Sequence, residues 1–221
     1  MDFNCKCGRC NTESYLWSLG KLKFSNKYSP EKTIEAIRQL SKKYDYWVEI
    51  PKNASFALHY PFRVQEGLTN IEIKDLEKDK KGFFIFRDPI DRFKSMLSHY
   101  FIDGARNGKG KEWLLGVIGK DLLKNITGNN ICDIILDNFN SLETIPESHH
   151  FNSQRFFIPD KFFDRLNYDV FNMNWAKNNL NEYNSSSSKD IFISRENEKK
   201  IKELYEDDFQ LWEKIRGKIL K

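Results

Sequence analysis

Long apolar runs are absent from this sequence of 221 residues, and so are the compositions that mark fibrous or disordered chains. No segment approaches the roughly 18 consecutive apolar residues that a membrane-spanning helix needs. Glycine and proline are scarce, at 11 and 6 residues, which excludes a collagen-like or low-complexity chain. The first residues show no basic segment followed by an apolar one, as a secretory signal would have. We therefore expect a globular, cytoplasmic protein without a membrane span.

Neither charge nor cysteine is concentrated enough to define a function. The net charge of +4 is too small to indicate the basic stripe of a nucleic-acid binder, so no nucleic-acid partner is expected. A mildly basic protein would still suit an anionic ligand. Cys7 and Cys10 form one C-x-x-C pair, with Cys5 beside it, but no second pair follows, as a structural zinc site would have. Cys132 lies in an apolar helical pattern typical of a core. We expect no disulfide and no metal.

Strand and helix patterns alternate along the chain. Apolar runs rich in β-branched and aromatic residues predict strands at 46–50, 82–86, 168–171 and 191–193. Apolar spacing and capping residues predict one helix that begins at 29–31. They predict further helices at 89–101, 113–123, 131–139, 174–182 and 196–219, the last as one helix or a pair. This alternation predicts an α/β fold of three layers, in which helices flank a central parallel sheet. Residues 1–45 are expected to form an N-terminal arm and helix packed on a main domain at 46–221.

The first chemical motif comes directly after a predicted strand, at residues 50–55, Ile-Pro-Lys-Asn-Ala-Ser. A turn of small residues that leads into a helix exposes backbone N–H groups, which bind an oxyanion, and Lys52 adds a positive charge. The alternative is an ordinary strand-to-helix turn with a surface lysine.

The second motif, Arg87-Asp88-Pro89-x-x-Arg92-Phe93-x-Ser95, also follows a predicted strand. Asp88 is suited to cap a helix that starts at Pro89, which leaves Arg87 at the carboxyl end of the strand. Parallel strands would bring both motifs to one edge of the sheet, where α/β proteins bind ligands. A ligand with two anionic groups fits this arrangement. The chain has neither G-x-x-x-x-G-K-[ST] nor G-x-G-x-x-G, the motifs of common nucleotide sites.

Taken in order, these motifs resemble those of the carbohydrate sulfotransferases that use 3′-phosphoadenosine 5′-phosphosulfate (PAPS). Residues 50–55 resemble the family's loop for the 5′-phosphosulfate, and residues 87–95 its motif for the 3′-phosphate. His150-Phe151 with Gln154, then 168–170 and 205–209, resemble downstream blocks of the same family. The resemblance covers residues 46–212 and implies a P-loop-like sulfotransferase fold, with PAPS as co-substrate, no metal, and a carbohydrate or other hydroxyl-bearing acceptor.

The resemblance also implies roles for individual residues. Lys52 would stabilise the leaving oxygen, and Arg87 and Ser95 would bind the 3′-phosphate. His59 is the expected general base, with Glu66 and His150 as competitors. The cofactor-binding residues would be Pro51, Lys52, Asn53, Ala54, Ser55, Phe56, Arg87 and Ser95. Two other functions remain open, a kinase-like or NTPase enzyme that binds nucleotides and a non-catalytic binding module of the same fold.

Overall fold

The computed structural model describes residues 17–19, 31–48, 50, 52–53, 69–71, 81–102, 112, 115–116, 119–120, 124–144, 148–158, 167–180 and 191–220. The chain divides into two compact units. The sheet unit comprises residues 12–87, 154–184 and 211–221, and the helical unit comprises residues 1–11, 88–153 and 185–210. Within the described ranges, no helix is both long and apolar enough to cross a membrane.

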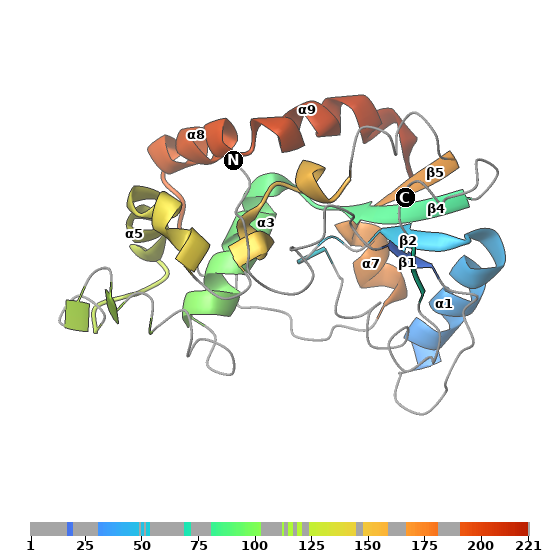
Figure 1. The fold of residues 1–221 in the computed structure, drawn as a ribbon, viewed down its shortest axis with the longest axis horizontal. Helices are drawn as coiled ribbons and strands as arrows, with labels where there is room; N and C mark the ends of the chain where they lie inside the picture. Colours follow the sequence, from blue (N-terminus) through green and yellow to red (C-terminus); the bar gives the residue numbers. More distant parts are fainter. Residues whose placement is uncertain are drawn as a thin grey trace. The chain divides into compact units, whose positions relative to one another are not determined.

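The sheet unit contains a sheet whose described strands follow the order β3-β1-β2-β4-β5-β6. The strands are β1 (Trp17–Leu19), β2 (Tyr46–Val48), β3 (Thr69–Ile71), β4 (Lys81–Phe86), β5 (Asn167–Asn172) and β6 (Ile219–Leu220). β2, β4, β5 and β6 run parallel, whereas β1 pairs antiparallel with both β2 and β3. Figure 1 shows β2, β4 and β5 side by side. The expected α/β fold with a parallel central sheet is therefore confirmed.

Both faces of the parallel strands are covered within this unit. Phe83 and Ile85 of β4 pack with helices α1 (Glu31–Lys43) and α7 (Met173–Asn179) on one face. Phe84 and Phe86 pack on the other face with residues 157–158 and with residues 211–215 of helix α9 (Glu206–Ile215). Because successive strand side chains point to opposite faces, a strand buried on both must be apolar throughout. The run from Gly82 to Phe86 meets this requirement, since all of it is buried.

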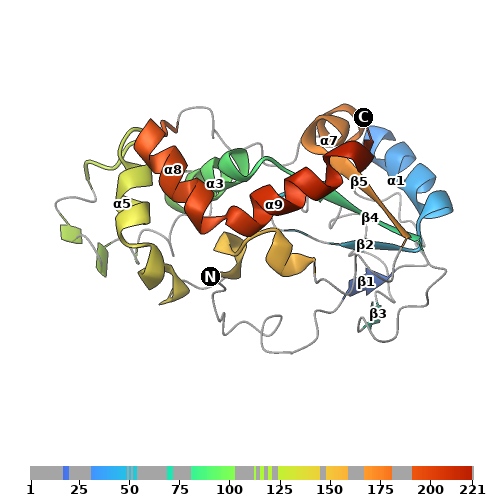
Figure 2. The same cartoon turned by 90° about the horizontal axis from the view of Figure 1, so that it is seen from above.

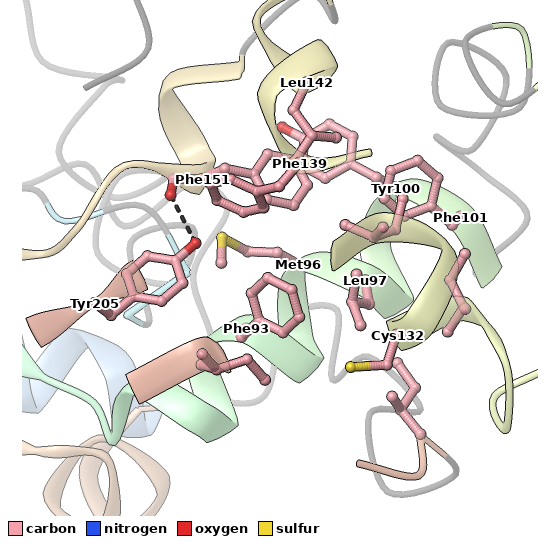
Figure 3. Packing of buried hydrophobic residues seen from close by; sticks show 14 residues of the cluster. Phe93, Met96, Leu97, Tyr100, Phe101, Cys132, Phe139, Leu142, Phe151 and Tyr205 are labelled. Atoms are coloured by element: carbon pink, nitrogen blue, oxygen red, sulfur yellow. Dashed lines mark hydrogen bonds between the residues drawn. The ribbon is translucent and has the colours of Figure 1, made fainter. Parts of the chain in front are cut away.

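The helical unit surrounds a separate apolar core, shown in Figure 3. Its described helices are α3 (Pro89–Leu97), which continues as a π-helical segment at Ser98–Ile102, α5 (Ile131–Asp137) and α8 (Arg195–Leu204). Helix α8 lies beside both α3 and α5 (Figure 2). Short 3₁₀ helices occur at Phe139–Thr144 and Ser148–Phe151 in this unit, and at Arg155–Phe157 and Arg216–Lys218 in the sheet unit.

Two sequence-based expectations need correction. The strand predicted at 191–193 is wrong, because this segment has no regular structure. Ile191 is instead buried in the helical core, and the Phe192 N–H donates to the Gly128 carbonyl oxygen (2.9 Å). Strands β1, β3 and β6 are not predicted from the sequence, and Ile219 of β6 belongs to the segment predicted as helical.

The other predicted elements are present with shifted ends. The predicted helix at 196–219 is a pair, α8 and α9, which breaks at Tyr205. Cys132 is buried in the helical core, as expected. Most of the segment 113–123 lies outside the described residues, and so does most of the N-terminal arm. The predicted boundary between residues 45 and 46 therefore stays a prediction.

Candidate functional site

A tight turn follows β2 at the carboxyl edge of the sheet. The Asn53 N–H donates to the Ile50 carbonyl oxygen (3.2 Å), and Lys52, at the third position of this four-residue turn, has a φ of +69°. A type II turn requires positive φ at that position, where glycine is the usual residue. For a residue with a Cβ atom, the left-handed conformation costs roughly 1–2 kcal/mol. The turn thus holds a lysine in a backbone conformation that lysine disfavours.

Arg87 lies against this turn. β2 and β4 are parallel neighbours, so the residues that follow them emerge at the same edge of the sheet. The Arg87 Nη1 atom donates to the Lys52 carbonyl oxygen (3.0 Å). Two motifs that are 35 residues apart in the sequence therefore meet, at the edge of the sheet where their positions after parallel strands predict both of them.

A buried amide network connects the two motifs to a third segment. Gln154 Oε1 accepts from the Arg87 backbone N–H (3.0 Å) and from Asn53 Nδ2 (2.5 Å), while Gln154 Nε2 donates to the Arg87 carbonyl oxygen (2.7 Å). Asn53 Nδ2 also donates to the Ile85 carbonyl oxygen (2.8 Å). Gln154 is 0% exposed and Asn53 is 2% exposed. Buried amides of this kind hold their neighbours in a defined geometry because each contact replaces one that water would make.

One polar atom of the turn is left over. In the described part of the chain, no donor bonds to the buried Oδ1 atom of Asn53. Leaving a buried acceptor unsatisfied costs about 1–3 kcal/mol, so the atom marks a place where another donor would be favourable. It belongs to the residue directly after Lys52.

The chemistry of this edge suits an anion. Lys52 and Arg87 are half-buried, and each carries a positive charge on a side chain that starts at the carboxyl end of a parallel strand. A guanidinium presents five N–H donors in a planar fork, which matches the geometry of a phosphate, and an ammonium acts as a compact charge. The described geometry can thus hold an anionic ligand at two points.

The rest of the second motif belongs to the helical unit. Asp88 caps α3 through a contact from the Asp91 N–H to its Oδ1 (3.0 Å), with Pro89 in the first turn, as predicted. Ser95 is a buried residue of α3. The structure describes the positions of both Arg87 and Ser95, but they lie in different units.

Arg92 is a structural residue of the helical unit. It is 1% exposed, and its guanidinium donates to the carbonyl oxygens of Asn152 (2.7 Å) and His150 (2.9 Å). Burial lowers the Arg92 pKa, and the charge of the buried Asp208 acts in the opposite direction. The guanidinium thus connects α3 to the segment 150–152, and Asp208 offsets part of the cost of burying its charge.

His150, one of the three candidate bases, lies in this connected segment. Its ring Nδ1 contacts the Tyr100 hydroxyl, and its side chain is half-buried. The neighbouring Phe151 carbonyl oxygen accepts from the Tyr205 hydroxyl (2.7 Å), the contact drawn in Figure 3. The backbone and the ring of His150 are therefore both fixed by side chains of the helical unit.

The remaining predicted site residues lie outside the described residues. They are Pro51, Ala54, Ser55, Phe56, His59 and Glu66. The cysteines at positions 5, 7 and 10 also lie outside them.

The contribution of Gln154 to the Lys52–Arg87 contact was not foreseen. The sequence singled this residue out only as part of a downstream block, because no periodicity or spacing indicates that its side chain bonds to a strand end.

Comparison of the chain with family models, with curated proteins and with solved structures found no match.

Proposed function

We propose that this protein is a sulfotransferase that moves a sulfuryl group from PAPS to a hydroxyl group, with a carbohydrate as the acceptor. The observation that carries the proposal is the contact between the Lys52 turn and Arg87 at the carboxyl edge of the parallel sheet. The two motifs that meet there are those that resemble the family's phosphosulfate loop and 3′-phosphate motif. PAPS carries one anionic group at the 3′ position of its ribose and another at the 5′ position. Two cationic side chains can each bind one of these groups.

The backbone of Lys52 supports a role for its side chain. Glycine adopts positive φ without strain, so a turn that served the fold alone would favour glycine at this position. Strained residues of this kind cluster at functional sites, where the side chain is needed in spite of the backbone cost. We attribute the lysine to its charge.

The proposed reaction is an in-line displacement at sulfur. The acceptor oxygen forms a bond to the sulfur atom while the bond from sulfur to the 5′-phosphate oxygen breaks, and adenosine 3′,5′-bisphosphate leaves. By analogy with phosphoryl transfer, the transition state is loose and negative charge develops on the leaving oxygen. The Lys52 ammonium would neutralise that charge, and a general base would take the acceptor's proton.

Arg87 would bind the 3′-phosphate in this scheme. Its Nη1 atom also donates to the Lys52 carbonyl oxygen, so the same side chain would hold the turn and contact the ligand. The resemblance assigns Ser95 to the same phosphate. For the base, His59 remains the first choice and Glu66 and His150 the competitors, since histidine has a pKa suited to proton transfer near neutral pH.

Two substitutions at Lys52 test the proposal. With labelled PAPS and a panel of glycans, Lys52→Ala and Lys52→Gly should each lower kcat on the order of 100–1,000-fold, because both remove the charge at the leaving oxygen. In thermal unfolding, Lys52→Gly should be at least as stable as Lys52→Ala, by up to about 1 kcal/mol, because glycine relieves the positive φ. The exposed Lys42 of α1 provides the control, and Lys42→Ala should leave both properties unchanged.

Three results would contradict the proposal. If kcat stayed constant and only KM rose, Lys52 would bind ligand without stabilising the transition state. Preference of the wild type for ATP, with hydrolysis, would indicate a kinase-like enzyme or NTPase. Binding of PAPS with no transfer to any acceptor would indicate a binding module.

A further inference from the structure

Gln154 pairs with the end of β4 as a neighbouring strand would. Its Oε1 and Nε2 atoms bond to the N–H and the carbonyl oxygen of the same residue, Arg87, at 3.0 and 2.7 Å. Two contacts to one residue fix both the position and the rotation of its backbone. They therefore fix the direction in which the Arg87 side chain leaves the sheet.

The same amide also holds the turn after β2. Gln154 Oε1 accepts from Asn53 Nδ2 (2.5 Å), Asn53 follows Lys52 in the chain, and the Lys52 carbonyl oxygen accepts from Arg87 Nη1 (3.0 Å). These contacts form a closed ring that joins Gln154, Asn53, Lys52 and Arg87. Movement of either cationic residue would break a contact to the other.

From this ring we infer that Gln154 is a positioning residue, which keeps Lys52 and Arg87 in one arrangement so that a single nucleoside bisphosphate is bound at both phosphates at once. The inference rests on the proposed function and extends it to a residue that touches neither phosphate. Two contacts to one ligand strengthen binding most when their spacing is fixed in advance, because less conformational freedom is then lost on binding. Gln154 supplies that fixed spacing.

Burial makes the amide hard to replace. Gln154 is 0% exposed, so water cannot substitute for its three contacts. A methionine at this position would keep the volume of the side chain but lose all three hydrogen bonds. The Arg87 backbone and the Asn53 side-chain amide would then lack their contacts to residue 154. Gln154→Met is accordingly the variant that removes the ring while disturbing the packing least.

Calorimetric titration with adenosine 3′,5′-bisphosphate and with adenosine 5′-monophosphate gives the required readout. The wild type should bind the bisphosphate at least about 100-fold more tightly, and Gln154→Met should reduce that ratio about 10-fold, with the monophosphate affinity changed by less than about threefold. Gln39→Ala, an exposed glutamine of α1 in the same unit, should behave as the wild type.

The outcomes separate this inference from the proposed function. An unchanged ratio in Gln154→Met, or an equal loss of affinity for both nucleotides, would show a merely structural role and overturn the inference alone. A wild type that does not prefer the bisphosphate would overturn the proposed function and the inference with it.

A measurement on the wild type covers the case in which Gln154→Met does not fold. Adenosine 3′-monophosphate should slow hydrogen exchange of the backbone N–H groups of Arg87 and Asn53 together. The ring of contacts transmits the constraint from one residue to the other. Protection of the Arg87 amide without the Asn53 amide would overturn the inference.

Discussion

At the scale of single residues, Asp169 shows how a surface carboxylate becomes part of the fold. Its Oδ2 atom accepts from the Tyr44 hydroxyl (2.5 Å) and lies 2.9 Å from Lys43 Nζ and 3.0 Å from Lys81 Nζ. Burial pushes the Asp169 pKa upward, but the hydrogen bonds from Tyr44, Lys43 and Lys81 outweigh it and lower the pKa to about 2. The carboxylate thereby links β5 to α1 and β4 at the end of the strands opposite the candidate site.

This shift predicts a pH dependence of stability. The folded-state pKa of Asp169 lies below its usual value, so the stabilisation is complete above pH 4 and disappears as the pH falls toward 2. Asp169→Asn should lower the free energy of unfolding by about 2 kcal/mol at pH 7, and this difference should vanish on acidification. Denaturant titrations at several pH values measure it. Glu198→Gln, which removes an exposed ion pair with Lys202 on α8, should change stability little at any pH.

At the scale of elements, the start of α3 is determined by adjacent residues. Asp88 accepts the Asp91 N–H and Pro89 needs no hydrogen-bond partner for its nitrogen, so sequence and structure agree on where this helix begins. The π-helical segment that follows, from Ser98 to Ile102, has no comparable local signal.

The Asp88 cap predicts a loss of stability when the side-chain oxygen that accepts the Asp91 N–H is removed. Asp88→Ala should lower stability by about 1 kcal/mol, because it leaves the Asp91 N–H without its acceptor, while Asp88→Asn should keep most of the stability. Asp91→Ala is the matched control, since the capping contact uses only the backbone of Asp91. Equal losses in Asp88→Ala and Asp91→Ala would attribute the effect to charge at the helix N-terminus instead of to the cap.

In the molecule as a whole, the described residues form one apolar cluster in the helical unit and two in the sheet unit. The sheet unit buries both faces of β4, and the helical unit buries the residues around Phe93 and Met96 shown in Figure 3. The Lys52–Arg87 contact lies within the sheet unit. A ligand that binds there should stabilise this unit.

Thermal unfolding with nucleotides tests this prediction. A ligand that binds only the folded state, at a hundredfold excess over its Kd, adds about 2.7 kcal/mol. For a chain of this size, adenosine 3′,5′-bisphosphate should then raise Tm by about 5–10 °C. Adenosine 5′-monophosphate should raise it less, and Arg87→Ala should remove most of the difference. Equal shifts with both nucleotides in the wild type would count against a 3′-phosphate site.

Features that depend on neighbouring residues can be predicted from the sequence alone. Strands β2, β4 and β5, the Asp88 cap and the parallel sheet follow from apolar runs and capping residues, whose effects act over a few positions. The common edge of Lys52 and Arg87 also followed, because residues after parallel strands emerge at the same edge. Their contact depends on the pairing of β2 with β4, which the sequence does not indicate.

The polar residues that hold the fold together, in contrast, are identified by the three-dimensional arrangement and not by the sequence pattern. Arg87 and Arg92 belong to one motif, yet one is half-buried against the Lys52 turn and the other is enclosed by backbone carbonyls of residues 150 and 152. The role of Gln154 also depends on residues that are distant in the sequence, since Arg87 is 67 positions away and Asn53 is 101 positions away. Likewise, Ile191 packs in a core instead of joining the sheet. Hydrogen bonds and packing between distant segments depend on where the whole chain places them, and no local pattern carries that information.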